Sequence, residues 1–167
     1  MKVIVIGPRG KMGKLITQVA AERDDMELVA GVAPAGRDYV GQDLGMVALI
    51  GRNLGVPVVD DLAAVIDGCD VIIDFSTREN ALKVLDLAVK HGKALVCGTT
   101  GFSEEEFARF KEAAKTIPML YAANTSKLVN IMNKLLEMVT KTLGEDADIE
   151  ILEMHDQWKK DAPSGTS

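Results

Sequence analysis

The stretch Val3-Ile4-Val5-Ile6-Gly7-Pro8-Arg9-Gly10-Lys11-Met12-Gly13 decides the fold of this chain. An apolar run, typical of a strand that is buried on both faces, leads into three glycines with the spacing G-x-x-G-x-x-G and then into a helical pattern. Glycines at such a junction let the backbone turn sharply and approach a pyrophosphate, and the following helix terminus offers N–H groups to the anion. The stretch therefore predicts a dinucleotide-binding unit; an ordinary glycine-rich turn is the alternative.

Short apolar runs and amphipathic segments alternate after this stretch. The further strand candidates are Leu28–Val32, Val71–Phe75, Ala94–Cys97 and Met119–Ala122. Ser103 and Glu106 have the spacing of a capping box at the start of one of the helical segments between them. This alternation predicts an α/β fold, a Rossmann-type parallel sheet with helices on both faces. The glycine-rich stretch Pro34–Gly55 predicts an irregular connection with a short helical turn near Met46–Ile50.

The last part of the chain has a different pattern. Ser126–Leu143 has the spacing of a long amphipathic helix capped by Thr125 or Ser126. Its expected buried face carries Leu128, Ile131, Met132, Leu135, Val139 and Leu143. Ile149–Met154 is predicted to be a strand. We therefore expect two domains, a dinucleotide-binding domain over residues 1–124 and the start of a mixed α/β substrate domain over residues 125–167.

Composition excludes several classes of protein. The chain has 167 residues and a formal net charge of −6, which argues against nucleic acid or an anionic membrane as a partner. Cys69 and Cys97 are the two cysteines, so neither a disulfide framework nor a metal site is expected. No apolar run reaches the ~18 residues of a membrane span. A cytoplasmic protein without a metal is the expectation.

Residues at the ends of the strands are candidates for the dinucleotide site, because ligands of such sheets bind at the carboxyl ends of the strands. Phe75-Ser76, Gly98-Thr99-Thr100 and the segment from Ala122 to Asn124 each follow a predicted strand, although such residues also make ordinary turns and caps. The predicted cofactor-binding residues are Gly7, Arg9, Gly10, Lys11, Met12, Gly13, Arg37, Phe75, Ser76, Gly98, Thr99, Thr100, Ala122 and Asn124.

The second strand lacks the usual acidic residue that binds the ribose hydroxyls. The sequence there is Gly31-Val32-Ala33-Pro34-Ala35-Gly36-Arg37. Without a carboxylate, a 2′-phosphate is not repelled, and Arg37 or Arg9 can bind it. This favours NADPH over NADH, while a plain solvent-facing role for Arg37 is equally compatible with the sequence.

The C-terminal run carries a specific resemblance. Lys159-x-Asp161-Ala162-Pro163-Ser164-Gly165-Thr166, the preceding Glu153-x-His155, the first glycine loop and Gly98–Phe102 together resemble dihydrodipicolinate reductase, the 4-hydroxy-tetrahydrodipicolinate reductase of bacterial lysine and diaminopimelate synthesis. The resemblance implies an NAD(P)H-dependent oxidoreductase that acts on a small dicarboxylate and forms a homotetramer at full length. It further implies that His155 is the general acid, assisted by Lys159. The implied substrate-binding residues are Asp156, Lys159, Ser164, Gly165 and Thr166.

Three parts of the sequence depart from the family pattern. The family has two adjacent histidines where this chain has His155-Asp156, and Asn-Phe-Ser-x-Gly-Val where it has Asn124-Thr125-Ser126-Lys127-Leu128-Val129. Arg78 stands where proline is usual. The carboxylate of Asp156 would repel a dianion, so a related reductase of the 2,4-diaminopentanoate dehydrogenase type is an alternative function. A nucleotide-binding homologue without catalytic activity is another.

Length adds one more expectation. Members of the family are longer than 167 residues, so we expect this chain to be a fragment that stops after the Ser164-Gly165-Thr166 motif. The predicted strand Ile149–Met154 would then have too few partners to be stable, because an isolated strand or hairpin is marginal in water.

Overall fold

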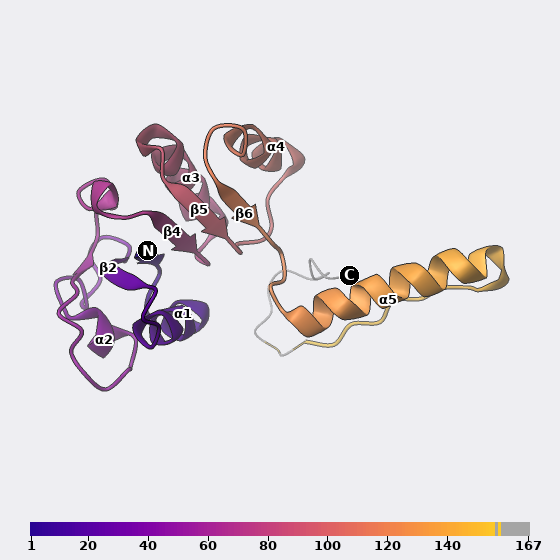
Figure 1. Ribbon diagram of the computed structural model, residues 1–167, viewed down its shortest axis with the longest axis horizontal. Coiled ribbons are helices and arrows are strands. Elements are labelled where there is room, and N and C mark those ends of the chain that lie inside the picture. Colours follow the sequence, from indigo (N-terminus) through magenta and orange to yellow (C-terminus); the bar gives the residue numbers. More distant parts are fainter. Residues whose placement is uncertain (156, 158–167) are drawn as a thin grey trace. The chain divides into compact units, whose positions relative to one another are not determined.

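The computed structural model of the chain describes residues 1–155 and 157. It contains two compact units, Met1–Tyr121 and a second that begins at Ala122. Their elements are shown in Figure 1. None of the helices in the described part of the chain has the length and apolar character needed to cross a bilayer.

The first unit is built on one parallel sheet. Its strands are β1 (Lys2–Ile6), β2 (Glu27–Val32), β3 (Val58–Val59), β4 (Val71–Asp74), β5 (Ala94–Cys97) and β6 (Met119–Tyr121), in the order β3-β2-β1-β4-β5-β6. Ile6 at the end of β1 is in register with Val32 of β2 and with Asp74 of β4. The strand order reverses between β1 and β4, which is where such sheets bind ligands. The Rossmann-type prediction is confirmed.

Helices cover both faces of this sheet, as the sequence predicted. The helices of the whole chain are α1 (Lys11–Ala21), α2 (Leu44–Val47), α3 (Arg78–His91), α4 (Glu104–Ala113) and α5 (Lys127–Leu143), with the short 3₁₀ turns η1 (Ile66–Gly68) and η2 (Gly144–Asp146). Alternate β1 residues point to opposite faces. Ile4 and Ile6 belong to the core that includes α3 and α4, whereas Val3 and Val5 belong to a core against which Ile16 of α1 packs.

Local signals for helix ends are also confirmed. Ser103 and Glu106 form the predicted capping box: the Ser103 hydroxyl accepts from the Glu106 N–H at 3.2 Å, and the Glu106 carboxylate accepts from the Ser103 N–H at 2.8 Å. Ser126 caps α5 by accepting from the Val129 N–H at 3.4 Å. Each cap satisfies N–H groups that have no partner inside the helix.

The connection after β2 is organised around one carboxylate. Asp43 Oδ1 accepts from the N–H groups of Gly45 and Leu54, and Oδ2 accepts from those of Gly55 and Val56. Although burial acts to raise the pKa of Asp43, these four backbone hydrogen bonds lower it below its ordinary value. Because Asp43 caps α2, the short helix lies at Leu44–Val47 and not at the predicted Met46–Ile50.

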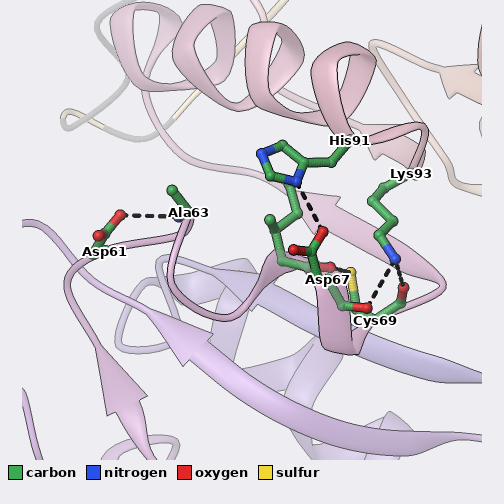
Figure 2. A network of polar contacts seen from close by, with 7 residues as sticks. Asp61, Ala63, Asp67, Cys69, His91 and Lys93 are labelled. Atoms are coloured by element: carbon green, nitrogen blue, oxygen red, sulfur yellow. Dashed lines mark hydrogen bonds and ion pairs between the residues drawn. The ribbon is translucent and has the colours of Figure 1, made fainter.

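A second polar network lies at the amino ends of β4 and β5 (Figure 2). Lys93 donates to the carbonyls of Asp67 at 3.0 Å and Cys69 at 2.8 Å, and His91 Nδ1 lies 2.8 Å from Asp67 Oδ1. The hydrogen bond from His91 lowers the pKa of the Asp67 carboxyl. These contacts join η1 to the end of α3 beside the first residues of β4 and β5.

Two expectations about the second unit are wrong. The apolar face of α5 is not buried: the exposed fractions of Leu128, Ile131 and Leu135 are 76%, 58% and 55%, and no residue of α5 is buried. Ile149–Met154 forms no strand. A strand needs a neighbour for its N–H and C=O groups, and the described residues provide no pairing partner for this segment.

Candidate functional site

The glycine loop brings the start of α1 to the carboxyl edge of the sheet. Gly7 has a positive φ of 66°, and its N–H donates to the Val32 carbonyl at 2.8 Å while its own carbonyl accepts from Gly10 N–H at 2.9 Å. A Cβ at Gly13 would overlap the Gly7 carbonyl oxygen. Glycine at position 13 therefore permits the close packing of helix on loop that a dinucleotide-binding turn requires.

The first turn of α1 is suited to an anion. Gly10 is its N-cap and provides no side-chain hydrogen bond, and the turn contains no acidic residue. The N–H groups of Lys11, Met12 and Gly13 belong to this turn, where helical N–H groups lack partners within the helix. Together with the positive end of the helix dipole they can bind a pyrophosphate.

A cavity of about 500 Å³ lies next to this loop, at the ends of β1, β2 and β4. Gly7 and Ser76, both predicted from the sequence, line it. Its other lining residues, which were not predicted, include Ala33, Pro34, Asp60, Asn80 and Lys83. The small residues at the end of β2 are the sequence signal that could have indicated this cavity, because their short side chains leave room beside the sheet. The volume lies in the usual range for a small-molecule site.

The loops after β4 and β5 contact each other at the same edge of the sheet. The Phe75 ring contacts Gly98 so closely that no Cβ fits at position 98. Ser76 N–H donates to Thr99 Oγ1 at 3.0 Å, which joins the two loops directly. The structure thus brings together the predicted residues Phe75, Ser76, Gly98 and Thr99. Thr100 follows them on the same loop.

Asp74, at the end of β4, is another polar residue of this edge, and it was not among the predicted cofactor-binding residues. It is fully buried and accepts hydrogen bonds from the hydroxyls of Ser76 and Thr99 at 2.5 and 3.0 Å. Burial raises the pKa of the Asp74 carboxyl, and these hydrogen bonds act in the opposite direction. An acidic residue inside an otherwise apolar strand was the signal that could have identified it.

Arg9 and the loop after β2 come together at the surface. The Arg9 guanidinium lies 2.9 Å from the Asp38 carboxylate and 4.9 Å from the centre of the Tyr39 ring. Arg37, the neighbour of Asp38 in sequence, is exposed. The end of β2, which carries no acidic residue, is therefore followed by a surface loop whose Asp38 carboxylate contacts Arg9 of the glycine loop.

The second unit holds the remaining described candidates. A cavity of about 710 Å³ is lined by residues that include both Asn124 and His155. His155 Nε2 lies 3.1 Å from a Glu153 carboxylate oxygen. Asn124 Oδ1 accepts from the Ser126 N–H at 2.9 Å, and Ala122 is partly buried. The predicted residues Asp156, Lys159, Ser164, Gly165 and Thr166 lie outside the described residues.

Comparisons with known proteins cover the whole chain. Residues 1–125 match a family model described as dihydrodipicolinate reductase, N-terminus, and residues 128–167 match dihydrodipicolinate reductase, C-terminus. The 4-hydroxy-tetrahydrodipicolinate reductases of Geobacter metallireducens and Hahella chejuensis are 47% and 43% identical over 167 and 166 residues. Those matches cover 100% and 99% of this chain, which spans 62% of the length of each relative.

Solved structures agree with the sequence comparisons. A dipicolinate-bound dihydrodipicolinate reductase from Paenisporosarcina sp. TG-14 superposes with a TM-score of 0.76 and 30% identity, over 99% of this chain and 62% of that one. A saccharopine dehydrogenase from Saccharomyces cerevisiae, at 14% identity and a TM-score of 0.61 over 84% of this chain and 31% of its own, shares the fold alone. With both family models matched in order along the sequence, this chain belongs to the dihydrodipicolinate reductase family.

Proposed function

We propose that this chain forms the cofactor-binding unit and part of the substrate unit of a 4-hydroxy-tetrahydrodipicolinate reductase of lysine and diaminopimelate synthesis. The observation that carries the proposal is the ordered match of residues 1–125 and 128–167 to the two parts of that family. The glycine loop and its cavity at the switch point of the sheet support it independently, because they are features of a dinucleotide site.

The residues of the first unit fit a nicotinamide dinucleotide. Gly7 and Gly13 permit close approach of backbone and helix, and the first turn of α1 offers N–H groups to the pyrophosphate. The loops after β4 and β5 would hold the nicotinamide end. When bound, the reduced cofactor supplies the hydride, and the protein excludes water and orients the two reactants.

NADPH is the cofactor we favour. Arg9 carries a positive charge beside the ribose position, and the end of β2 has no carboxylate to repel a 2′-phosphate. Asp38 holds Arg9 and would compete with the phosphate for it. Arg9→Gln should therefore raise the KM for NADPH about tenfold, in line with the loss of one charge-assisted contact, and leave the KM for NADH unchanged. An equal change for both cofactors would contradict this assignment.

A cyclic dicarboxylate is the proposed substrate. Lys159 would bind one carboxylate, and Ser164, Gly165 and Thr166 the other. Dipicolinate, which is bound to the Paenisporosarcina enzyme, is a dicarboxylate of this kind. His155 is the proposed general acid, assisted by Lys159, because imidazole exchanges protons near neutral pH. Its contact with Glu153 at 3.1 Å orients the ring.

The homotetramer expected for the full-length protein is part of the proposal. The exposed apolar residues of α5 support it, because a long exposed apolar helix face in water favours association. A mass measurement in solution on the full-length protein tests it. A monomer at micromolar concentration would exclude the tetramer.

Turnover is the decisive test of the function. The oxidation of NADPH and of NADH should depend on 4-hydroxy-tetrahydrodipicolinate, followed by the absorbance of the reduced nicotinamide. His155→Gln should lower kcat by about 10²- to 10⁴-fold, the usual contribution of a general acid. Cofactor binding without turnover would instead support a non-catalytic homologue.

Asp156 is the reason to consider one alternative substrate class, which the same turnover assay can test. A carboxylate beside the general acid would suit a substrate ammonium group, as in a reductase of the 2,4-diaminopentanoate dehydrogenase type. If that alternative holds, the parent chain should reductively aminate the amino-keto acid when ammonium is supplied as the nitrogen source, and Asp156→His should shift activity toward 4-hydroxy-tetrahydrodipicolinate. No change in preference would remove it.

A further inference from the structure

Asp74 lies where two strands of the site end side by side. It is the last residue of β4, it is in register with Cys97 of β5, and its relative exposure is 0%. Burying a carboxylate is costly unless donors replace the water it loses. An apolar side chain would fill the same place in a sheet core at lower cost, so the contacts of this carboxylate call for an explanation.

The two oxygens of Asp74 bind different loops. Oδ1 accepts from the Ser76 hydroxyl at 2.5 Å, and Oδ2 accepts from the Thr99 hydroxyl at 3.0 Å and the Cys97 thiol at 3.7 Å. Ser76 N–H donates to Thr99 Oγ1 at 3.0 Å, which closes the ring of contacts. One buried side chain thus joins the loop after β4 to the loop after β5.

The network also reaches α3. Asn80 Nδ2 donates to the Ser76 hydroxyl oxygen at 3.0 Å, and Asn80 lines the cavity beside the glycine loop. The Ser76 hydroxyl therefore donates to Asp74 and accepts from Asn80. Such a fully satisfied buried network fixes one arrangement of the groups that it joins.

These contacts determine which hydrogen-bonding groups of the two loops are available to a cofactor. The hydroxyl protons of Ser76 and Thr99 are both donated to Asp74, and the Ser76 N–H is donated to Thr99 Oγ1, so these donors hold the two loops together and are not available to a cofactor. Backbone N–H and C=O groups bind a ligand well only when the loops that carry them are held in place before binding. Phe75 against Gly98 adds a second contact between the same loops.

We propose that Asp74 is a positioning residue for the nicotinamide end of the cofactor: its carboxylate fixes the loops after β4 and β5 against each other without touching the cofactor. The proposal rests on the proposed function of the first unit. It assigns to Asp74 an effect on the nicotinamide end and none on the adenosine end, which the glycine loop and the β2 connection hold.

Binding measurements can distinguish an effect on the nicotinamide end of the cofactor from an effect on its adenosine end. Calorimetry would give the Kd of the chain for NADPH and for 2′,5′-ADP, which lacks the nicotinamide nucleotide. Asp74→Asn and Thr99→Val should each weaken NADPH about tenfold, which corresponds to about 1.4 kcal/mol, and leave the affinity for 2′,5′-ADP unchanged. Thr99→Ser keeps the donor to Asp74 and should keep the parent affinity for both ligands.

A double variant distinguishes positioning from direct contact. If Asp74 acts through Thr99, the Asp74→Asn/Thr99→Val protein should bind NADPH no more weakly than the weaker of the two single variants. Additive losses would mean that Thr99 contacts the cofactor by itself, and would overturn the proposal. Should Asp74→Asn fail to fold, the Thr99→Val and Thr99→Ser pair decides: equal affinities of these two for NADPH would also overturn it.

Asp67→Asn is the matched control. Asp67 also joins two elements through its carboxylate, by its contact with His91, but it lies at the amino ends of the strands and does not line the cavity. It should leave both Kd values unchanged. Parallel losses for both ligands in the Asp74 and Asp67 variants would show a merely structural role and overturn the proposal. If the parent chain binds neither ligand, the proposed function fails too; if it binds both and the variants bind equally well, only the positioning proposal fails.

Discussion

The two units of this chain bury their apolar residues very differently. In the first, Ile4, Ile72 and Leu85 are 0–2% exposed between sheet and helices. In the second, α5 is the longest helix of the chain, yet none of its residues is buried. The helical segments of both units have apolar residues at helical spacing. Such periodicity predicts where a helix forms but not which element covers its apolar face. A helix face becomes core only when another element packs against it.

The largest expected effect uses the same substitution in both units. Leu85→Ala in α3 removes a side chain that is 2% exposed, whereas Leu135→Ala in α5 removes one that is 55% exposed. We expect Leu85→Ala to lower the free energy of unfolding by about 2–5 kcal/mol, and Leu135→Ala to change it by less than about 0.5 kcal/mol. Urea denaturation measures both. Equal losses would mean that the α5 face is covered in solution.

A single methyl group at the glycine loop should have the next largest effect. Gly13→Ala places a Cβ against the Gly7 carbonyl oxygen, and overpacking of this kind costs about 1–3 kcal/mol. It should also weaken NADPH binding, since α1 must move away from the loop. Gly68→Ala is the control, because its Cβ would meet no atom within 4 Å. Normal stability and binding of Gly13→Ala would show that the loop is not closely packed.

The buried carboxylate of Asp74 should make its own contribution to the pH dependence of stability. Burial raises the pKa of Asp74 above 3.8 in the folded chain, so the folded state holds this proton more tightly than the unfolded state does. This group therefore makes stability fall as pH rises from about 3.8 through its folded pKa. Asp74→Asn should remove that fall in denaturation curves taken across this range. An unchanged slope would contradict the raised pKa.

The smallest effect is expected on the surface of α5. Glu137 lies between Lys134 and Lys141 at 2.7 and 2.6 Å, and hydrogen bonds from both lower its pKa. Exposed pairs of this kind are screened by salt. Glu137→Gln should reduce the helical circular dichroism signal slightly at low salt and not at all at high salt. A loss that persists at high salt would indicate that Glu137 contacts something other than these two lysines.

Much of the first unit could be predicted because its signals are local. The run Val3–Ile6, the glycines at 7, 10 and 13 and the capping box at Ser103 each specify their own geometry within a few residues. β3 was not predicted, because its two residues are too few to show the alternation of a strand. The loop around Asp43 was not predicted because its partners at 54–56 are distant in sequence.

The site was only partly predictable, because some of its residues depend on contacts between segments that are distant in sequence. The glycine loop and the residues after β4 and β5 follow strands and could be found in order along the chain. Asp74 and Lys83 gain their significance from neighbours on other elements, which the sequence does not place. In the second unit, Ile149–Met154 had the pattern of a strand, but a pattern cannot provide the neighbouring strand that pairing requires.

The carboxylate of Asp43 has a consequence for motion. It accepts from four amides that span Gly45 to Val56, so those hydrogens can exchange with solvent only after their hydrogen bonds to the carboxylate break. Their exchange should then follow a single opening event with one common rate, instead of fraying residue by residue. The connection after β2 would in this way open and close as one cooperative unit, because a single side chain holds its two ends together.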